Sequence, residues 1–348
     1  MDNQFTSSFE GKGVINADVL DAWFPPSPLV IERLKVYSNY WQNMSPPTCA
    51  EGLIEAISNY YSVSTSETLV GAGSSALWFL YALSNLNSES TVLLIEPGYG
   101  EYHHVCSNVV GCNVEYFSTS VDEGFMLDLE KWVDQIVERK ANFAILINPN
   151  NPSGVAVSRL DLMAALNRVP ESTQVLIDEA YMDFWDPDQS LLLGPIPPNV
   201  TVISSFSKRF ALSGLRVAMM RSNPSMVKKL QVRTPPWAVS MPAQIAGCAA
   251  LLQPEYYKDQ YSKTHEIRRA LKVGLEQLGY MVIDTCANWL LFEVMEADSM
   301  CRSLEVKGLF VRNVGKTAPS LANRWVRIAV KDERINQRIL EILESTAN

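Results

Sequence analysis

The sequence predicts an α/β protein in which a mostly parallel sheet of about seven strands is followed by a smaller α+β unit. Two observations lead to this prediction. Short β-branched runs alternate with longer helical patterns across residues 68–222, as in chains whose parallel strands are joined by helices. Several of these runs are apolar nearly throughout, which is typical of strands covered by helices on both faces.

The expected elements follow one another along the chain. The strands of the sheet are expected at TLVGAG (68–73), TVLLIEP (91–97), NVEYF (113–117), FAILINP (143–149), QVLIDEAY (174–181), VTVISSFS (200–207) and RVAMMRS (216–222). Helical patterns separate them, for example at 74–86 and 128–140. After the TPPW break, the sequence predicts a long helix over 254–278, strands at YMVIDT, NWLLFEV, LFVRNV and RWVRIAV, and a final helix from Asp332.

The chain length of 348 residues suits two domains. We expect an N-terminal arm of residues 1–45, a large α/β domain of residues 46–235 and a small C-terminal α+β domain of residues 236–348. The first segment is rich in proline (Pro25, Pro26 and Pro28). It therefore resembles an arm more than a third domain.

Composition excludes several classes of function. A net charge of −9 argues against nucleic acid as the main partner, because phosphate binding requires a basic surface. No apolar run is long enough to span a bilayer, and the first residues lack the pattern of a signal peptide. We therefore expect a cytoplasmic protein. The six scattered cysteines and only three histidines predict reduced thiols and no metal site.

Polar residues stand at the ends of five predicted strands, in GAGSS, EPGY, NPNNP, DEAY and SFSK. Ligands of open α/β sheets bind beyond the carboxyl ends of the strands, so these groups converge on one crevice. The GAGSS turn opens a helix and suits a phosphate, although a plain strand-to-helix turn has the same pattern. Asp178 is either a structural cap or an ionised partner for a protonated ring nitrogen, because a buried carboxylate is costly unless paired.

Lys208 lies in the segment SSFSKRFALSGLR, residues 204–216, among several apolar side chains. It is either a solvated loop charge or an amine kept for chemistry. Apolar surroundings disfavour an ammonium ion, so the second interpretation predicts a neutral amine.

Three motifs, NPNNPSG, IDEAYMDF and SSFSKRFALSGLR, occur in this order and spacing. With them the chain resembles the fold-type-I pyridoxal-phosphate enzymes. Within that group it is similar to class I/II aminotransferases, especially histidinol-phosphate aminotransferase and threonine-phosphate decarboxylase. The resemblance covers nearly the whole chain. It implies the aspartate aminotransferase-like fold, the cofactor pyridoxal 5′-phosphate and a homodimer.

The resemblance also implies roles for single residues. Lys208 matches the Schiff-base lysine, Asp178 matches the partner of the pyridine nitrogen, and Tyr99 matches the aromatic residue stacked on the ring. Asn151 and Tyr181 match the pair that hydrogen-bonds the phenolic oxygen. The residues that match the phosphate cradle are Gly73, Ser74, Ser75, Ser205, Ser207 and Arg216.

Substrate residues are implied as well. Arg327 matches the arginine that clamps a carboxylate, since a guanidinium forms a fork for two oxygens; otherwise it is a surface arginine. Arg312 matches an arginine that meets the distal substrate group, or it is simply exposed. Departures from the family pattern fall in the arm, where Asp21 and Phe24 occupy the substrate-binding segment VLDAWFPPSP. Ser45 stands where the family has a tyrosine that reaches the neighbouring subunit, a role open to Tyr40 or Trp41.

The resemblance implies an aminotransferase that acts on an amino acid or an amino-alcohol phosphate. Three alternatives stay open at the level of sequence. They are a decarboxylase of the threonine-phosphate type, an eliminating or cyclising enzyme of specialised amino-acid metabolism, and a non-catalytic domain of this fold. The intact set of Lys208, Asp178 and Arg216 argues against the last of these.

Overall fold

The structure, a computed structural model, describes residues 13–315 and 318–347. A seven-stranded sheet with the order β2-β8-β7-β6-β5-β3-β4 forms its larger part. The strands are β2 (Thr68–Gly71), β3 (Thr91–Glu96), β4 (Asn113–Ser118), β5 (Phe143–Ile147), β6 (Gln174–Asp178), β7 (Val200–Ser205) and β8 (Ala218–Arg221). Only β8 runs antiparallel to its neighbours β2 and β7. All seven predicted strands are present, and the mostly parallel sheet is confirmed.

Side chains of this sheet alternate between two hydrophobic cores. On β5, Ala144 and Leu146 join one core, whereas Phe143 and Ile145 join the other. This alternation explains the continuous apolar runs in the sequence, because both faces of the sheet are covered. Helices α5 (Ser74–Asn85), α6 (Gly100–His103) and α11 (Pro224–Gln231) supply one core, and α4 (Glu51–Tyr61), α7 (Leu129–Glu138), α8 (Arg159–Leu166) and α12 (Met241–Leu251) supply the other.

Local sequence sets where the predicted helices begin. Asp128 caps α7, with its side chain accepting a hydrogen bond from the Lys131 backbone N–H at 3.1 Å. Side-chain oxygens at this position satisfy the free N–H groups of a first helical turn. Gly73 precedes α5 with φ +94°, a conformation that side chains rarely adopt. The chain therefore turns sharply from β2 into α5.

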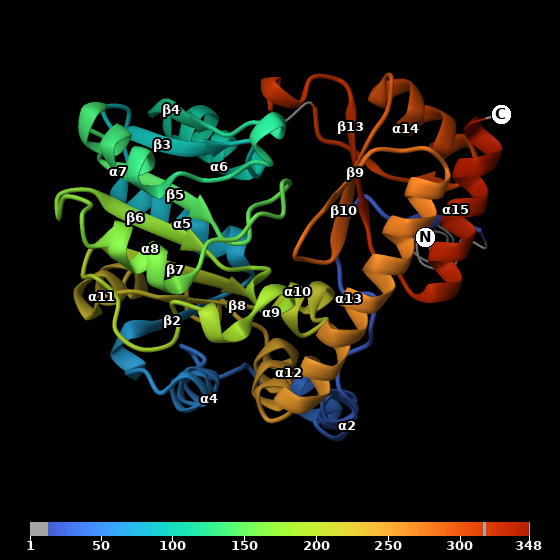
Figure 1. The fold of residues 1–348 in the computed structure, drawn as a ribbon. Helices are drawn as coiled ribbons and strands as arrows, with labels where there is room; N and C mark the ends of the chain where they lie inside the picture. Colours follow the sequence, from blue (N-terminus) through green and yellow to red (C-terminus); the bar gives the residue numbers. More distant parts are fainter. Residues whose placement is uncertain (1–12, 316–317, 348) are drawn as a thin grey trace.

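A second, smaller part lies to the right in Figure 1. Its antiparallel sheet has the order β12-β13-β10-β9. The elements are α13 (Pro254–Gln277), β9 (Val282–Asp284), β10 (Trp289–Glu293), α14 (Ala297–Val306), β11 (Leu309–Phe310), β12 (Arg312–Asn313), β13 (Trp325–Ala329) and α15 (Glu333–Ala347). The single strand predicted at LFVRNV is two strands, because β11 pairs with the arm while β12 pairs with β13.

The arm runs from one part to the other. Strand β1 (Ile15–Asn16) pairs in parallel with β11, and Ala17 accepts a hydrogen bond from the Ala329 N–H. The arm continues through α2 (Pro28–Val36) and α3 (Ser38–Asn43), and α2 packs against α12 at the bottom of Figure 1. The predicted domain boundaries at 45 and 235 stay predictions, and α12 lies just beyond the second of them.

Short elements complete the chain. They are α9 (Met182–Trp185), α10 (Phe206–Arg209), a π-helical turn at His104–Val110, and 3-10 turns at Thr65–Glu67, Val121–Glu123, Pro187–Gln189, Ser213–Leu215 and Pro319–Leu321. Within residues 13–315 and 318–347, no helix is long and apolar enough to cross a bilayer.

Candidate active site

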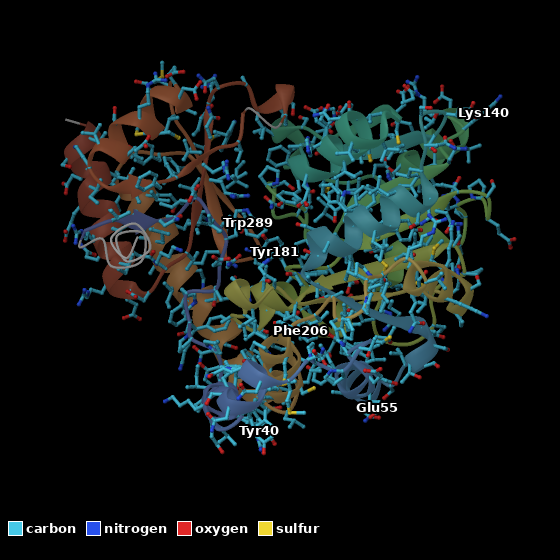
Figure 2. The ribbon with its side chains drawn as sticks, turned by 180° about the vertical axis from the view of Figure 1, so that it is seen from behind. Tyr40, Glu55, Lys140, Tyr181, Phe206 and Trp289 are labelled. Carbon is cyan, nitrogen blue, oxygen red and sulfur yellow. The ribbon has the colours of Figure 1, made fainter. Side chains whose placement is uncertain are left out.

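A cavity lies where the carboxyl ends of the large sheet face the arm and the small sheet. Nine of the predicted site residues line it: Ser74, Tyr99, Asn151, Asp178, Tyr181, Ser205, Lys208, Arg312 and Arg327. Asp18, Val19 and Leu20 of the arm also line it. Seen from behind in Figure 2, Tyr181 and Trp289 lie between the two parts of the molecule. The convergence of strand ends predicted from sequence is therefore present.

Asp178 is buried at the end of β6. Its Oδ2 accepts a hydrogen bond from the Tyr102 hydroxyl at 2.7 Å, and its Oδ1 accepts one from the Ala180 N–H at 2.9 Å. Burial raises the pKa of Asp178 to about 6, although these two hydrogen bonds oppose the rise. No ion pair to Asp178 occurs within the described part of the chain. A cationic ring nitrogen would supply that missing charge.

The start of α5 and the turn before β8 form a cradle. Arg216 donates from Nη1 to the Ser207 hydroxyl at 3.2 Å and to the Ser213 carbonyl at 3.0 Å. A Cβ atom on Gly73 would lie 2.5 Å from Nη2 of Arg216, so glycine is needed for this close approach. The first turn of a helix also offers unpaired N–H groups and the positive end of its dipole. These donors together fit a phosphate.

Of the predicted cradle, only Ser74 and Ser205 line the cavity, whereas Gly73, Ser75, Ser207 and Arg216 do not. Ser207 is buried and bonded to Arg216. The Ser75 hydroxyl donates to Oε2 of Glu101 at 3.0 Å. The Ser75 hydroxyl is thus engaged by a carboxylate, which leaves its backbone N–H as the group suited to an anion.

Lys208 extends from α10 into the cavity and meets a carboxylate. Its Nζ lies 2.8 Å from Oδ1 of Asp21. Its apolar sequence neighbours Phe206 and Phe210 pack into the core, so the group that the amine contacts is the carboxylate of Asp21.

Two arginines line the same cavity from the small sheet. Arg312 and Arg327 are directly opposite one another on β12 and β13. Arg327 donates from Nη1 to Oδ1 of Asn151 at 2.7 Å and from Nη2 to the Asp18 carbonyl at 2.8 Å. Its Nε is buried and has no partner among the described residues. Burial lowers the pKa of Arg327, and the charge of Arg312 adds to this effect. An anion bound beside Arg327 would offset both the burial of its charge and the repulsion from Arg312.

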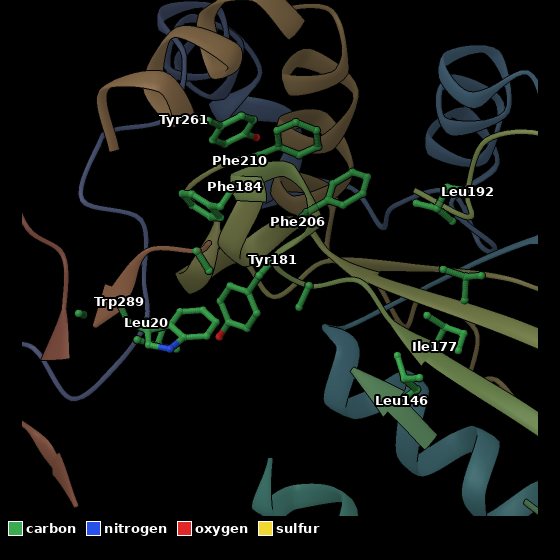
Figure 3. Close-up of a cluster of buried hydrophobic side chains, with 14 of the residues drawn as sticks. Leu20, Leu146, Ile177, Tyr181, Phe184, Leu192, Phe206, Phe210, Tyr261 and Trp289 are labelled. Carbon is green, nitrogen blue, oxygen red and sulfur yellow. The ribbon is translucent and has the colours of Figure 1, made fainter. Parts of the chain in front are cut away.

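Aromatic side chains form the walls. The Tyr181 ring packs edge-on against Trp289 with centroids 4.7 Å apart, as Figure 3 shows. Tyr99 lines the cavity and is 45% exposed, so its ring is available to a ligand. Asn151 keeps its amide N–H₂ free to donate, because Arg327 uses only its oxygen.

Two residues of the arm lie elsewhere. Phe24 is buried against Phe184, Tyr257 and Tyr261 and does not line the cavity, so its predicted substrate contact has no support. Ser45 is exposed on another surface.

Sequence reasoning missed three residues near the site: Tyr102, Glu101 and Asp18. Tyr102 follows Tyr99 by three positions, a spacing that brings two side chains to one side of a helical turn. That spacing was the signal for Tyr102. Asp18 contributes its backbone carbonyl. Every residue has this group, so the sequence gives no signal for it.

A family model of aminotransferase class I and II matches residues 26–343. The chain therefore belongs to this family. It is a pyridoxal-phosphate-dependent aminotransferase, as the sequence predicted, and its fold is the predicted one.

Individual relatives agree with this result. Histidinol-phosphate aminotransferase of Desulfitobacterium hafniense (strain Y51) is 29% identical over 346 residues, which are 97% of this chain and 93% of the relative. Among solved structures, histidinol-phosphate aminotransferase from Sinorhizobium meliloti in complex with pyridoxal-5′-phosphate has a TM-score of 0.87 at 20% identity, covering 99% of this chain and 93% of that one. L-threonine-O-3-phosphate decarboxylase from Porphyromonas gingivalis has a TM-score of 0.80 at 22% identity, covering 96% and 99%. Both structural matches concern the fold.

Proposed function

We propose that this aminotransferase acts on an amino substrate that carries an anionic group, either an α-amino acid or an amino-alcohol phosphate, and passes the amino group to a 2-oxo acid. The observation behind this proposal is the buried, unpaired Nε of Arg327 beside Arg312 in the cavity that also holds Lys208. Two guanidinium groups side by side suit a substrate with a carboxylate or a phosphate.

The cofactor would be held at its phosphate, its ring nitrogen, its ring face and its phenolic oxygen. The cradle of Ser74, Ser75, Ser205, Ser207 and Arg216 with the Gly73 turn would bind its phosphate. Asp178 would pair with its ring nitrogen, and Tyr99 would stack on the ring. Asn151 and Tyr181 would donate hydrogen bonds to its phenolic oxygen. The fit rests on the close approach of Arg216 to Gly73 and on the buried carboxylate of Asp178.

Bound pyridoxal phosphate supplies an electron sink and a covalent attachment point for amines. The chain supplies the rest. Lys208 lies on the cavity wall, where its Nζ would accept the proton of the substrate α-carbon and later return it. Arg327 would fix the anionic group and so orient the substrate. Asp178 would stay ionised beside the cationic ring nitrogen, since opposite charges stabilise one another in a buried site.

The first test is spectroscopic. Wild-type protein is expected to be yellow with cofactor, and Lys208→Ala should lose the visible absorption while still binding cofactor through its phosphate. Lys131→Ala, an exposed lysine on α7, serves as the control and should keep the absorption. A colourless wild type that cannot be reconstituted would contradict the proposal.

The reaction type is tested with a panel of amino acids and amino-alcohol phosphates. Transamination predicts stoichiometric formation of the pyridoxamine form of the cofactor, with its return on adding a 2-oxo acid. Release of carbon dioxide instead would favour the decarboxylase, and release of ammonia the eliminating enzyme. The similarity to the Desulfitobacterium hafniense aminotransferase, which spans nearly the whole of both chains, supports transamination.

We also propose a homodimer in the cytoplasm. An apolar hollow near the arm is lined by Tyr37, Tyr40, Met44 and Leu252, each well exposed. Figure 2 shows Tyr40 at the lower edge of the molecule. Exposed apolar patches of this kind mark interaction surfaces, and Ser45 lies in the same hollow. Tyr40→Asp should shift the sedimentation profile towards monomer, and a wild type that sediments as an active monomer would refute the dimer.

A further inference from the structure

The carboxylate of Asp21 meets the amine of Lys208, a residue that lines the cavity. Its Oδ1 accepts hydrogen bonds from Lys208 Nζ at 2.8 Å and from the Ser213 hydroxyl at 2.7 Å. Burial alone would raise the pKa of Asp21, but the charges of Lys208 and Lys331 and the two hydrogen bonds hold it below its usual value. The carboxylate is therefore ionised.

Lys331 is the second cation. It follows β13 and is partly buried. Burial lowers the pKa of Lys331, and the charge of Lys208 adds to the effect, while Asp21 and Asp18 oppose it. Lys331 is thus a second positive charge near Asp21, but of the two lysines only Lys208 has a described hydrogen bond to this carboxylate.

The arm holds Asp21 in place from both sides. Before it, β1 is bonded to β11, and the Asp18 carbonyl accepts from Arg327 at 2.8 Å. After it, Trp23 Nε1 donates to the Thr264 hydroxyl at 2.8 Å, and Phe24 is buried among aromatic rings. A carboxylate on so firmly anchored a segment has a fixed position relative to Lys208.

We propose that Asp21 is a positioning residue that docks the ammonium group of Lys208 whenever this nitrogen is not bonded to the cofactor. This inference rests on the role of Lys208 in the proposed function. It replaces the substrate contact that the sequence predicted for Asp21.

The chemistry explains why a docking group is useful. When Lys208 takes the proton from the substrate α-carbon, a C–H bond breaks, its electron pair stays with the substrate, and an N–H bond forms on Nζ. The amine becomes a cation in a site that already contains Arg312 and Arg327. Asp21 supplies the counter-charge at hydrogen-bond distance, and the proton can then be returned.

Other charged and titratable groups also face this site. They are Asp18 from the arm, Tyr99 before α6, Asp178 and Tyr181 after β6, and Arg312 and Arg327 from the small sheet. In the described part of the chain, none of these groups accepts a hydrogen bond from Lys208 Nζ. Its acceptor is Asp21. The substitutions below therefore change the partner of Lys208 without removing any cofactor contact named above.

The test measures the chemical reactivity of Lys208 directly. The full chain, freed of cofactor, is treated briefly with acetic anhydride at neutral pH, and modification at Lys208 is followed by mass spectrometry against the exposed Lys131. Only the neutral amine reacts. Asp21→Asn should raise the rate at Lys208 several-fold, because the amine loses the carboxylate that holds it at 2.8 Å. Asp21→Glu, which keeps the charge, should keep the slow rate.

A fast rate in Asp21→Asn beside a slow rate in Asp21→Glu cannot come from a general loosening of the site. Asp134→Asn, taken from a surface ion pair, is the matched control and should leave the rate unchanged. An unchanged or slower rate in Asp21→Asn would overturn the docking role, and so would an Asp21→Glu rate as fast as that of Asp21→Asn. If Asp21→Asn does not fold, Asp21→Ser takes its place with the same expected sign.

Steady-state kinetics provide a second readout. A positioning role predicts that Asp21→Asn lowers kcat with little change in KM, whereas a substrate contact predicts a higher KM with kcat unchanged. The second result would overturn the proposal. The labelling experiment needs no substrate, so it can fail while the yellow colour and the transamination test succeed. Failure of this inference is therefore distinguishable from failure of the proposed function.

Discussion

Asp178 is a buried carboxylate at the cavity with no ion pair among the described residues. It is 7% exposed, and Tyr102 and Ala180 are its two hydrogen-bond donors. Neutral donors reduce the cost of a buried carboxylate but do not remove it. The pKa of Asp178, raised to about 6, reflects the remaining free-energy cost of burying the ionised carboxylate. The chain alone therefore keeps a destabilising charge at a place where the cofactor supplies its partner.

This charge makes stability depend on pH. The pKa of Asp178 is raised from 3.8 to about 6 in the folded chain, so its contribution is fully present below about pH 4 and is lost as the pH rises through 6. For the chain freed of cofactor, we expect Asp178 alone to contribute a loss of about 3 kcal/mol across this window. Urea unfolding at several pH values measures it.

Asp178→Asn should flatten that part of the profile, and Asp134→Asn, an exposed aspartate on α7, should leave it unchanged. Glu179 has a pKa raised by burial to about 7, so a decline between pH 5 and 7 should persist in Asp178→Asn. A profile that is equally steep in wild type and Asp178→Asn would show that Asp178 is already paired.

At the level of single residues, the sequence indicates which residues suit a chemical role better than it indicates which side chains are in contact. Asp178 and Lys208 were singled out at the ends of predicted strands, and Arg327 was singled out through the family resemblance of its segment RWVRIAV. Tyr102 was missed, because a buried tyrosine looks like any core residue until its hydroxyl is located. Phe24 was misplaced, because a sequence position in the arm does not show whether a ring faces the cavity or the core.

Among the elements, the buried strands were the most predictable. Their apolar runs are long enough to identify because both faces of the sheet are covered. The division of residues 309–314 into β11 and β12 was not predictable, since it depends on a pairing with β1, which lies near the other end of the chain. The π-helical turn at His104–Val110 likewise has no signal in the residue pattern.

The turn between β2 and α5 allows a prediction at this scale. Gly73 combines a positive φ with a close approach of Arg216. Gly73→Ala should displace the Arg216 guanidinium and weaken pyridoxal phosphate binding at least tenfold, because the cradle loses a charge-assisted contact of about 1.5 kcal/mol or more. Titration of the visible absorption measures this affinity.

Gly111→Ala is the matched control. Gly111 also has a positive φ, +82°, but a Cβ atom added there would meet no other atom within 4 Å. The strain of a side chain at positive φ should therefore appear as a stability loss in both variants, and a loss of cofactor affinity should appear only in Gly73→Ala. Equal affinities would mean that Arg216 can move without consequence.

At the scale of the whole molecule, the cavity exists only because three parts of the chain meet. The large sheet contributes Asp178 and the small sheet contributes Arg327. The arm contributes the Asp18 carbonyl. The sequence predicted the parts and most of the residues. Their meeting depends on long-range packing, which no local pattern specifies. The sequence therefore assigned substrate contacts to both Asp21 and Phe24, although Asp21 hydrogen-bonds Lys208 and Phe24 is buried in the core.

Arg327 joins these three parts through one guanidinium group. It lies on β13 of the small sheet, and it bonds Asn151 of the large part and Asp18 of the arm. Arg327→Lys keeps the positive charge but loses the planar guanidinium that can bind two oxygens at once, because an ammonium group is a compact point charge. We expect KM for the amino substrate to rise at least tenfold, in line with the loss of one charge-assisted hydrogen bond of about 1.5–3 kcal/mol, while the visible absorption of the bound cofactor stays the same.

Arg324→Lys is the control for this prediction, since Arg324 is an exposed arginine of the same region that pairs with Glu293. It should leave KM unchanged. A rise in KM confined to Arg327→Lys would support the two-oxygen clamp, and a KM equal to wild type would mean that the anionic group of the substrate binds elsewhere in the cavity. A changed cofactor spectrum in Arg327→Lys would show instead that the link through Asn151 positions the cofactor itself.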